Sequence, residues 1–285
     1  MKGMAMCCVL AAILPLACQP LRNATASAIV VSPNRGNPVP TKRDGEHTVS
    51  VGPPSATLSL EIIDCKNPRG TVFVLHGIRA DRTSLRSWGE MLAAASFRAI
   101  LVDLRGHGRS TGDGLSYGVI ESRDLAQALD ALLAGGLHVG SVGVMGFSYG
   151  AATGIQWAAI DARIRAVVAV ASFSSLRAIV QGYAPVPLTT DFVNGAVDLA
   201  GKQGGFDPDA ASPVVAIART RAAVLLIHGT EDRQVPAWHS ELIFAARPDR
   251  TELVLVPDAA HDSIVDDAVI DERVPSWLAA HLARE

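Results

Sequence analysis

The chain has 285 residues, 49% hydrophobic and 19% charged, so it is long and apolar enough to bury a large core and is not an intrinsically disordered protein. The formal net charge of −3 excludes the broadly basic surface with which proteins bind nucleic acid. Only Cys65 follows Cys18, and no cysteine or histidine spacing matches a metal site, so we expect no disulfide, metal or cofactor in a processed chain.

The first 26 residues have the pattern of a signal peptide. Lys2 precedes a nearly continuous apolar run over residues 4–17, which is too short to span a bilayer and is followed by small and polar residues. Two cleavage sites remain open: after the Ala-Thr-Ala of residues 24–26, or before Cys18, where Leu-Ala-Cys is similar to the end of a bacterial lipoprotein signal despite Pro15. We therefore expect an exported protein that is periplasmic, secreted, or anchored to a membrane by a lipid on Cys18.

Residues 27–55 are predicted to be a tether outside the fold. Between Asn23 and Pro54 the chain has five prolines, scattered charges and no Phe, Tyr or Trp, a composition typical of linkers. Residues 56–285 are then expected to form a single domain.

Beyond residue 56, short aliphatic or β-branched runs alternate with segments of helical period. This alternation predicts an α/β fold with a mostly parallel central sheet flanked by helices on both faces. Helical stripes begin at Leu85, Leu125 and Val274. The expected strands are Thr57–Ile63, Thr71–Leu75, Ala99–Val102, Val139–Met145, Ala166–Val170, Ala223–Ile227 and Glu252–Val256.

Residues 172–212 interrupt this alternation. About forty residues separate two expected strands here, which is more than a simple crossover needs. The segment contains Pro185, Pro187 and one helical stretch around Phe192 to Leu199. We expect a small lid over a site, with a longer solvent-exposed crossover as the alternative.

Ser148 is the candidate nucleophile. The sequence Gly146-Phe147-Ser148-Tyr149-Gly150 follows an expected strand and precedes a helix, which is the context that a Gly-x-Ser-x-Gly elbow requires. Such a turn holds the serine in a strained conformation, and side chains two residues away on either side would collide, so both positions need glycine. The turn lifts the hydroxyl above the edge of the sheet.

Two later loops supply a candidate acid and a candidate base. A serine hydroxyl needs a base to become nucleophilic, and the base needs an acid to orient it. Asp232 lies in the loop after the sixth expected strand, and His261 lies in the loop after the seventh. Because the carboxyl ends of parallel strands meet at one edge of a sheet, we expect both side chains to lie near Ser148. The adjacent Glu231 is the alternative acid.

In the order serine, acid, histidine, the chain resembles the α/β-hydrolase superfamily over about residues 57–283. Four blocks carry this resemblance: His76-Gly77, the Asp-Leu-Arg-Gly-His-Gly-Arg-Ser of residues 103–110, the Ser148 elbow, and the loops of Asp232 and His261. Within the superfamily, Arg-Gly-His-Gly-x-Ser followed by Tyr117-Gly118 and Glu121-x-x-Asp124 is similar to the small-capped Bem46 or serine-aminopeptidase-like group.

The resemblance implies a serine hydrolase that needs no cofactor and acts on a small-molecule ester. The family pattern assigns the oxyanion hole to the backbone N–H groups of Ile78 and Tyr149. It also supports Asp232 as the acid, because residues 171–180, where some relatives carry it, contain none. The Asp103 loop is expected to shape the site through hydrogen bonds without reacting.

A carboxylesterase for short or medium acyl esters is the expected function. Aminopeptidase or thioesterase activity on the same triad is one alternative. A non-catalytic, exported binding module on the same scaffold is another, since a fold alone does not establish turnover. The oligomeric state is left open.

Overall fold

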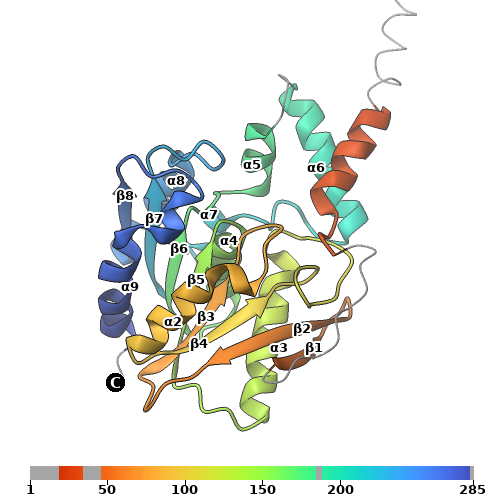
Figure 1. Ribbon diagram of the computed structural model, residues 1–285. Coiled ribbons are helices and arrows are strands. Elements are labelled where there is room, and N and C mark those ends of the chain that lie inside the picture. Colours follow the sequence, from red (N-terminus) through yellow and green to blue (C-terminus); the bar gives the residue numbers. More distant parts are fainter. Residues whose placement is uncertain (1–18, 35–45, 184–187, 283–285) are drawn as a thin grey trace, which may run out of the picture.

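The aliphatic runs of the sequence form one central sheet, which lies between helices in Figure 1. The computed structural model describes residues 19–34, 46–183 and 188–282. Within these ranges the strand order is β1-β2-β4-β3-β5-β6-β7-β8, and neighbours pair in parallel except for β1 with β2 and β2 with β4. The strands are β1 Glu46–Val51, β2 Ala56–Ile63, β3 Gly70–Leu75, β4 Arg98–Asp103, β5 Ser141–Phe147, β6 Ile164–Val170, β7 Ala223–Gly229 and β8 Thr251–Val256.

The predicted α/β fold is confirmed, and each expected strand lies within two residues of an observed one, β2 to β8. The central strands were recognisable because they are buried on both faces and therefore read as continuous apolar runs. Every residue of β3 and β4 is buried, for example.

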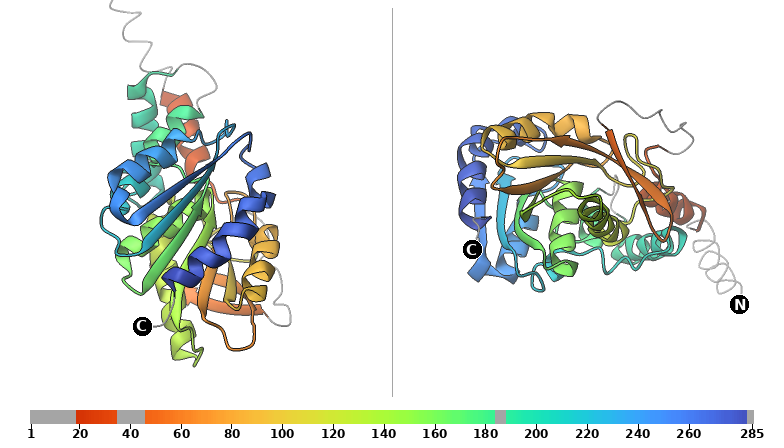
Figure 2. Two further views of the ribbon diagram at one scale, coloured as in Figure 1. Left: turned by 90° about the vertical axis from the view of Figure 1, so that its left-hand side faces the viewer. Right: turned by 90° about the horizontal axis from the view of Figure 1, so that it is seen from below.

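Helices cover both faces of the sheet because its strands present apolar side chains to both sides. Helices α3, α4 and α8 bury Leu129, Ile155 and Ile243 against one face, whereas α2 and α9 bury Trp88 and Leu278 against the other. Figure 2 shows helices on both sides of the twisted sheet. Their bounds are α2 Arg86–Ala94, α3 Val119–Ala134, α4 Tyr149–Ile160, α8 Trp238–Ala246 and α9 Ala268–His281, with short 3-10 turns η1 Arg82–Leu85, η2 Pro248–Arg250 and η3 Ser263–Asp266.

The segment predicted as a lid follows β6 and contains three helices. They are α5 Leu176–Gly182, α6 Thr190–Gly204 and α7 Pro213–Ala216. Helix α6 extends well beyond the expected stretch of 192–199, and α5 was not expected. Thr189 begins α6 by accepting a hydrogen bond from the Phe192 N–H, as a helix N-cap should. Pro185 and Pro187, which belong to the segment expected to form the lid, lie outside the described residues.

The structure corrects the predicted tether at its carboxyl end, where strand β1 forms the edge of the sheet. Val49 and Val51 are buried, with Val49 paired to Leu58 and Val51 to Ala56. The strand was missed because it is only half apolar, as is usual for an antiparallel edge strand with one wet face. Its neighbouring prolines also suggested a linker.

The structure also corrects the beginning of the tether, because residues 19–30 form a helix that packs beside α6 (Figures 1 and 2). Ala26 is fully buried and Ile29 nearly so, in a cluster with Val193 and Val197 of α6. Residues 1–18, which hold most of the expected leader, lie outside the described residues, so the signal peptide stays a prediction. No helix in the described part of the chain is both long and apolar enough to cross a membrane.

A buried cluster of charges joins β1 to the loops that follow β3 and β4. Arg82 forms ion pairs with Asp103 and, at 3.1 Å, with Glu46, and Arg109 donates to Glu46 at 2.7 Å. Asp103 also accepts the backbone N–H groups of Arg82 and Arg109, at 2.7 and 2.9 Å. The expectation that Asp103 shapes its loop by hydrogen bonding is therefore confirmed. Burial raises the pKa of its carboxyl group, although these N–H donors and the Arg82 charge oppose that effect.

Replacing Arg82 with methionine should lower the free energy of unfolding by about 3–5 kcal/mol, because it leaves the buried Asp103 carboxylate without its cation and removes one of the two arginines that face Glu46. Arg86→Met is the matched control, since Arg86 is half exposed and pairs with Glu61 and Glu90 at the surface, where a loss below about 1 kcal/mol is expected. Urea unfolding followed by circular dichroism measures both. Equal, small losses in the two variants would show that the cluster does not stabilise the fold.

Candidate active site

The turn between β5 and α4 presents Ser148. The backbone of Ser148 has φ 51° and ψ −108°, a strained conformation for a residue with a side chain. A Cβ on Gly146 would lie 2.4 Å from the carbonyl oxygen of Gly150, and a Cβ on Gly150 would lie 2.2 Å from that of Leu75. Glycine is therefore required at both positions, as predicted, because any side chain would push the turn away from the sheet.

Ser148, His261 and Asp232 form a row of hydrogen bonds. The Ser148 hydroxyl donates to His261 Nε2 at 3.1 Å, and His261 Nδ1–H donates to Asp232 Oδ2 at 2.6 Å. This network assigns the proton of the neutral imidazole to Nδ1 and leaves Nε2 as the acceptor. All three residues are buried, with Ser148 the most exposed at 8%. The structure thus brings together the three residues selected from the sequence.

Asp232 is surrounded by N–H donors. Its Oδ1 accepts the backbone N–H groups of Gln234 at 2.9 Å and Val235 at 2.8 Å. Its Oδ2 lies 3.3 Å from His228 Nε2 in addition to its bond with His261. Burial acts to raise the pKa of Asp232, but the hydrogen bonds from the two histidines and from Val235 outweigh it and hold the pKa well below its usual range.

The lowered pKa of Asp232 fixes the sign of its effect on stability. A carboxyl group with a folded-state pKa below the ordinary value of about 3.9 stabilises the fold above that value, and loses this contribution as the pH falls towards the folded-state pKa. Asp232 therefore stays ionised in neutral and mildly acidic solution. The alternative acid, Glu231, is exposed and lies 3.9 Å from Arg233.

Three other buried histidines hold loops near the site. His76 Nε2 accepts the Leu104 N–H at 3.0 Å, and burial lowers the pKa of His76 to about 3. His239 Nδ1 accepts the Ser174 N–H at 3.1 Å, and burial lowers the pKa of His239 to about 4. His228 Nδ1 bonds the Ser240 hydroxyl at 2.7 Å. The contact between His228 and the Asp232 carboxylate was not predicted, although the spacing of four residues between them was visible in the sequence.

The two expected oxyanion donors lie beside Ser148. Tyr149 is the first residue of α4, so its N–H has no acceptor within the helix. The loop of Ile78 approaches from the end of β3: a Cβ on Gly77 would lie 3.8 Å from the Ser148 Cβ. The positions of these residues suit N–H groups that receive a developing negative charge at an acyl carbon attacked by Ser148.

An aromatic group extends from the elbow towards the cap. The Tyr117 ring centroid lies 5.5 Å from that of Tyr149 and 6.1 Å from that of Phe173. The Tyr149 hydroxyl donates to the fully buried Glu121 at 2.8 Å. The Tyr117-Gly118 and Glu121 motif was the available signal, but its role depends on contacts between α4, α3 and the cap.

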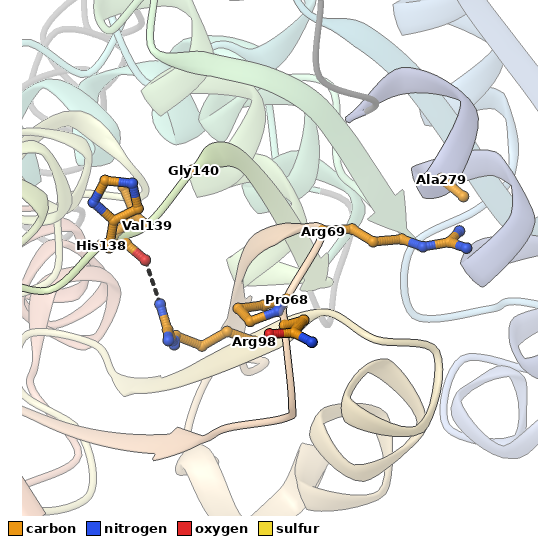
Figure 3. Close-up of a pocket in the computed structure, with 8 residues that line it drawn as sticks. Pro68, Arg69, Arg98, His138, Val139, Gly140 and Ala279 are labelled. Carbon is orange, nitrogen blue, oxygen red and sulfur yellow. Dashed lines mark hydrogen bonds between the residues drawn. The ribbon is translucent and has the colours of Figure 1, made fainter.

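A separate cavity of about 670 Å³ lies at the opposite, amino-terminal edge of the sheet. Its cationic groups do not converge: in Figure 3 the Arg98 side chain points to the His138 carbonyl, whereas Arg69 points away towards Ala279. Asp64 also pairs with Arg98 at 3.1 Å. Among the residues that the structure describes, there is no group of three or more His, Cys, Asp or Glu side chains that could hold a metal ion. The chemistry-bearing residues therefore gather at the carboxyl ends of the strands.

Comparison with known proteins gives one family and several structural likenesses. Residues 72–272 match the model of the alpha/beta hydrolase family. Uncharacterized protein YqkD of Bacillus subtilis is 23% identical over 203 residues, which cover 67% of this chain and 64% of that protein. The matched region therefore spans less than two thirds of this relative's length. The esterase Pf2001 of Pyrococcus furiosus superposes with a TM-score of 0.67 and 21% identity, over 84% of this chain and 93% of that one. A puromycin-hydrolyzing peptidase of Mycobacterium tuberculosis has a TM-score of 0.66 and 20% identity, over 85% of this chain and 40% of that one.

Asp232→Asn should lower kcat by about 10³- to 10⁴-fold, because an amide NH₂ facing His261 Nδ1 would favour the wrong tautomer. Asp262→Asn is the matched control: Asp262 is exposed, and its carboxylate accepts a hydrogen bond from the Gln234 side chain at 3.3 Å, so the change should alter kcat by less than about twofold. Steady-state hydrolysis of p-nitrophenyl butyrate measures both variants. A folded Asp232→Asn protein with the kcat of Asp262→Asn would contradict the assignment.

Proposed function

The chain belongs to the α/β-hydrolase family, and on that premise we propose that it is a serine hydrolase, a carboxylesterase that cleaves short or medium acyl esters. The observation that carries the proposal is the row of hydrogen bonds from Ser148 through His261 to Asp232, at 3.1 and 2.6 Å. The aromatic side chains of Tyr117 and Phe173 beside the elbow support an apolar acyl group.

The first half of the reaction transfers the acyl group to Ser148. The hydroxyl oxygen attacks the ester carbonyl carbon while its proton passes to His261 Nε2. The carbonyl oxygen becomes an anion that the N–H groups of Ile78 and Tyr149 stabilise. When the tetrahedral intermediate collapses, the alcohol leaves with the proton from His261, and Asp232 stabilises the imidazolium in between.

The second half releases the acid. A water molecule gives a proton to His261 Nε2 as its oxygen attacks the acyl-enzyme carbonyl. Collapse of this second intermediate returns the proton to the Ser148 oxygen and frees a carboxylic acid. The ionised Asp232 serves both halves in the same way, because its hydrogen bonds keep it charged at neutral pH.

We place the chain in the small-capped Bem46 or serine-aminopeptidase-like group. The support is the Tyr117-Gly118 and Glu121 motif, which lies between the elbow and a cap built from α5 and α6. Thioesterase or aminopeptidase chemistry on the same triad is the competing function, and the fold shared with a puromycin-hydrolyzing peptidase makes the amide case worth testing.

Export is proposed from the pattern of the first 26 residues, and the helix over residues 19–30 supports the cleavage site before Cys18. A cut after Ala26 would remove Arg22, whose guanidinium lies 5.4 Å from the centroid of the Phe192 ring, together with the buried Ala26. It would divide the helix and uncover the apolar side chains of α6. A cut before Cys18 leaves residues 19–30 in place.

The mature protein should therefore begin at a lipidated Cys18, and globomycin should block its processing. Mass spectrometry of the amino-terminal peptide measures this directly. A mature chain that begins at Ser27 and is processed in the presence of globomycin would contradict the proposal.

A fluorophosphonate probe should label folded protein at Ser148 and at no other serine. The reason is that Ser148 pairs with His261, which Asp232 orients, and keeps 8% of its surface exposed. Two other serines also bond histidines, Ser174 at 2.8 Å to His239 and Ser240 at 2.7 Å to His228, but both are more deeply buried. Ser148→Ala should abolish labelling and ester hydrolysis, and Ser174→Ala, the matched control, should retain both. Peptide mapping of the labelled chain measures the site.

Two results would overturn parts of this proposal. Absence of label at Ser148 in folded protein at neutral pH would contradict the serine hydrolase. If the labelled enzyme prefers aminoacyl anilides to p-nitrophenyl esters, measured by kcat/KM, the esterase is wrong and the aminopeptidase takes its place.

A further inference from the structure

The helix over residues 19–30 is bound to the cap by several different interactions. Ala26 and Ile29 are buried in the same apolar cluster as Phe173 of the site and Val197 of α6. Ser27 donates a hydrogen bond to the Gln203 side chain at 3.2 Å. In Figure 1 this helix runs alongside α6, above the edge of the sheet at which the strands of the site end. The helix is therefore a cap element supplied by the amino-terminal part of the chain.

Residues 31–34 join this helix to the loops around the site. Val31 forms a β-bridge with Gly114, and the Leu115 N–H donates to Val30 O at 3.0 Å. The Ser32 hydroxyl donates to Gly106 O at 2.7 Å, and the Asn34 amide donates to Gly108 O at 2.8 Å. The helix thus packs along the cap, and its carboxyl end is bound to the glycine-rich loop after β4.

Tyr117 connects this helix to the catalytic elbow. Its hydroxyl donates to Ile29 O at 2.9 Å, while its ring packs against Tyr149, the residue after the nucleophile. Its backbone is in the left-handed region, with φ 55°, which is unfavourable for a residue with a large side chain. Neighbouring groups hold it there: Gln156 donates to the Tyr117 carbonyl at 2.8 Å, and Glu121 accepts the Gly118 N–H at 2.9 Å.

The two sides of Ser148 differ in a way that assigns them to different parts of the substrate. His261 lies on the Phe147 side, with ring centroids 4.9 Å apart, and the leaving alcohol must stay within reach of its Nε2 proton. Tyr117 lies on the Tyr149 side and is partly exposed as a residue, whereas Tyr149 and Phe173 are buried. An acyl chain directed away from His261 would run on the side of Tyr149, against whose ring Tyr117 packs.

We propose that Tyr117, held in place by the helix over residues 19–30, limits the length of the acyl chain that the site accepts. The inference rests on the proposed esterase function and deepens it. Tyr117 is the contact residue, and Ile29 is a positioning residue that acts through it. A site closed in this way selects esters of short apolar acids over those of longer ones.

The test compares p-nitrophenyl acetate, butyrate and octanoate as substrates of the full chain and three variants. In Tyr117→Phe the ring loses its bond to the helix, and in Ile29→Ala the packing beneath that bond loses volume. Both should raise the octanoate-to-acetate ratio of kcat/KM by about five- to tenfold. Leu21→Ala is the matched control, because Leu21 lies on the same helix with 53% of its surface exposed, and should leave the ratio unchanged.

A general loss of stability lowers kcat/KM for all three esters together, so a change in the ratio reports on the acyl site. Circular dichroism confirms that each variant is folded, and Tyr117→Phe, which removes a single oxygen, remains informative if Ile29→Ala does not fold. Unchanged ratios in both folded variants, or an equal change in Leu21→Ala, would overturn the inference while leaving the esterase intact. A wild-type chain that is labelled at Ser148 but hydrolyses no ester would overturn the esterase and, with it, this inference.

Discussion

The close approach of the β5–α4 turn to the end of β3 is the constraint on which the site depends. It requires glycine at 146 and 150, since a Cβ on Gly150 would lie 2.2 Å from the Leu75 carbonyl oxygen. With the turn in this position, the loop of Gly77 lies against Ser148, so the backbone that follows β3 and the Ser148 side chain are adjacent. The strain at Ser148 persists because the surrounding strands are paired on both sides and cannot relax around it.

Burial and hydrogen bonding are balanced differently at the two buried acids discussed above. Both are removed from water, which disfavours a carboxylate, but Asp232 has enough N–H donors to keep its pKa low. At Asp103 burial is the stronger effect and the pKa is raised, so its ion pairs with arginine serve to join β1 and two loops. The net effect on the pKa is therefore opposite at the two acids, because only at Asp232 do the hydrogen bonds outweigh burial.

The parts of the fold that could be predicted are those in which local pattern and tertiary role agree. Strands β3 to β7 are buried on both faces and read as apolar runs, and the Gly-x-Ser-x-Gly turn needs its glycines for a purely local reason. Strand β1 and the helix over residues 19–30 were not predicted. Each depends on a partner outside its own segment, the adjacent strand β2 for one and the distant helix α6 for the other, and the composition of each alone suggests a linker or a leader.

The sequence by itself determined the α/β class, the order of the strands along the chain and the candidate residues Ser148, Asp232 and His261, because each is marked by a short pattern next to a recognisable strand. Only the tertiary structure decided that His261 reaches both Asp232 and Ser148, and that Tyr117 stands between the elbow and an amino-terminal helix. These features consist of contacts between segments far apart in the chain. No local pattern encodes such contacts, since they exist only once the sheet has brought the segments together.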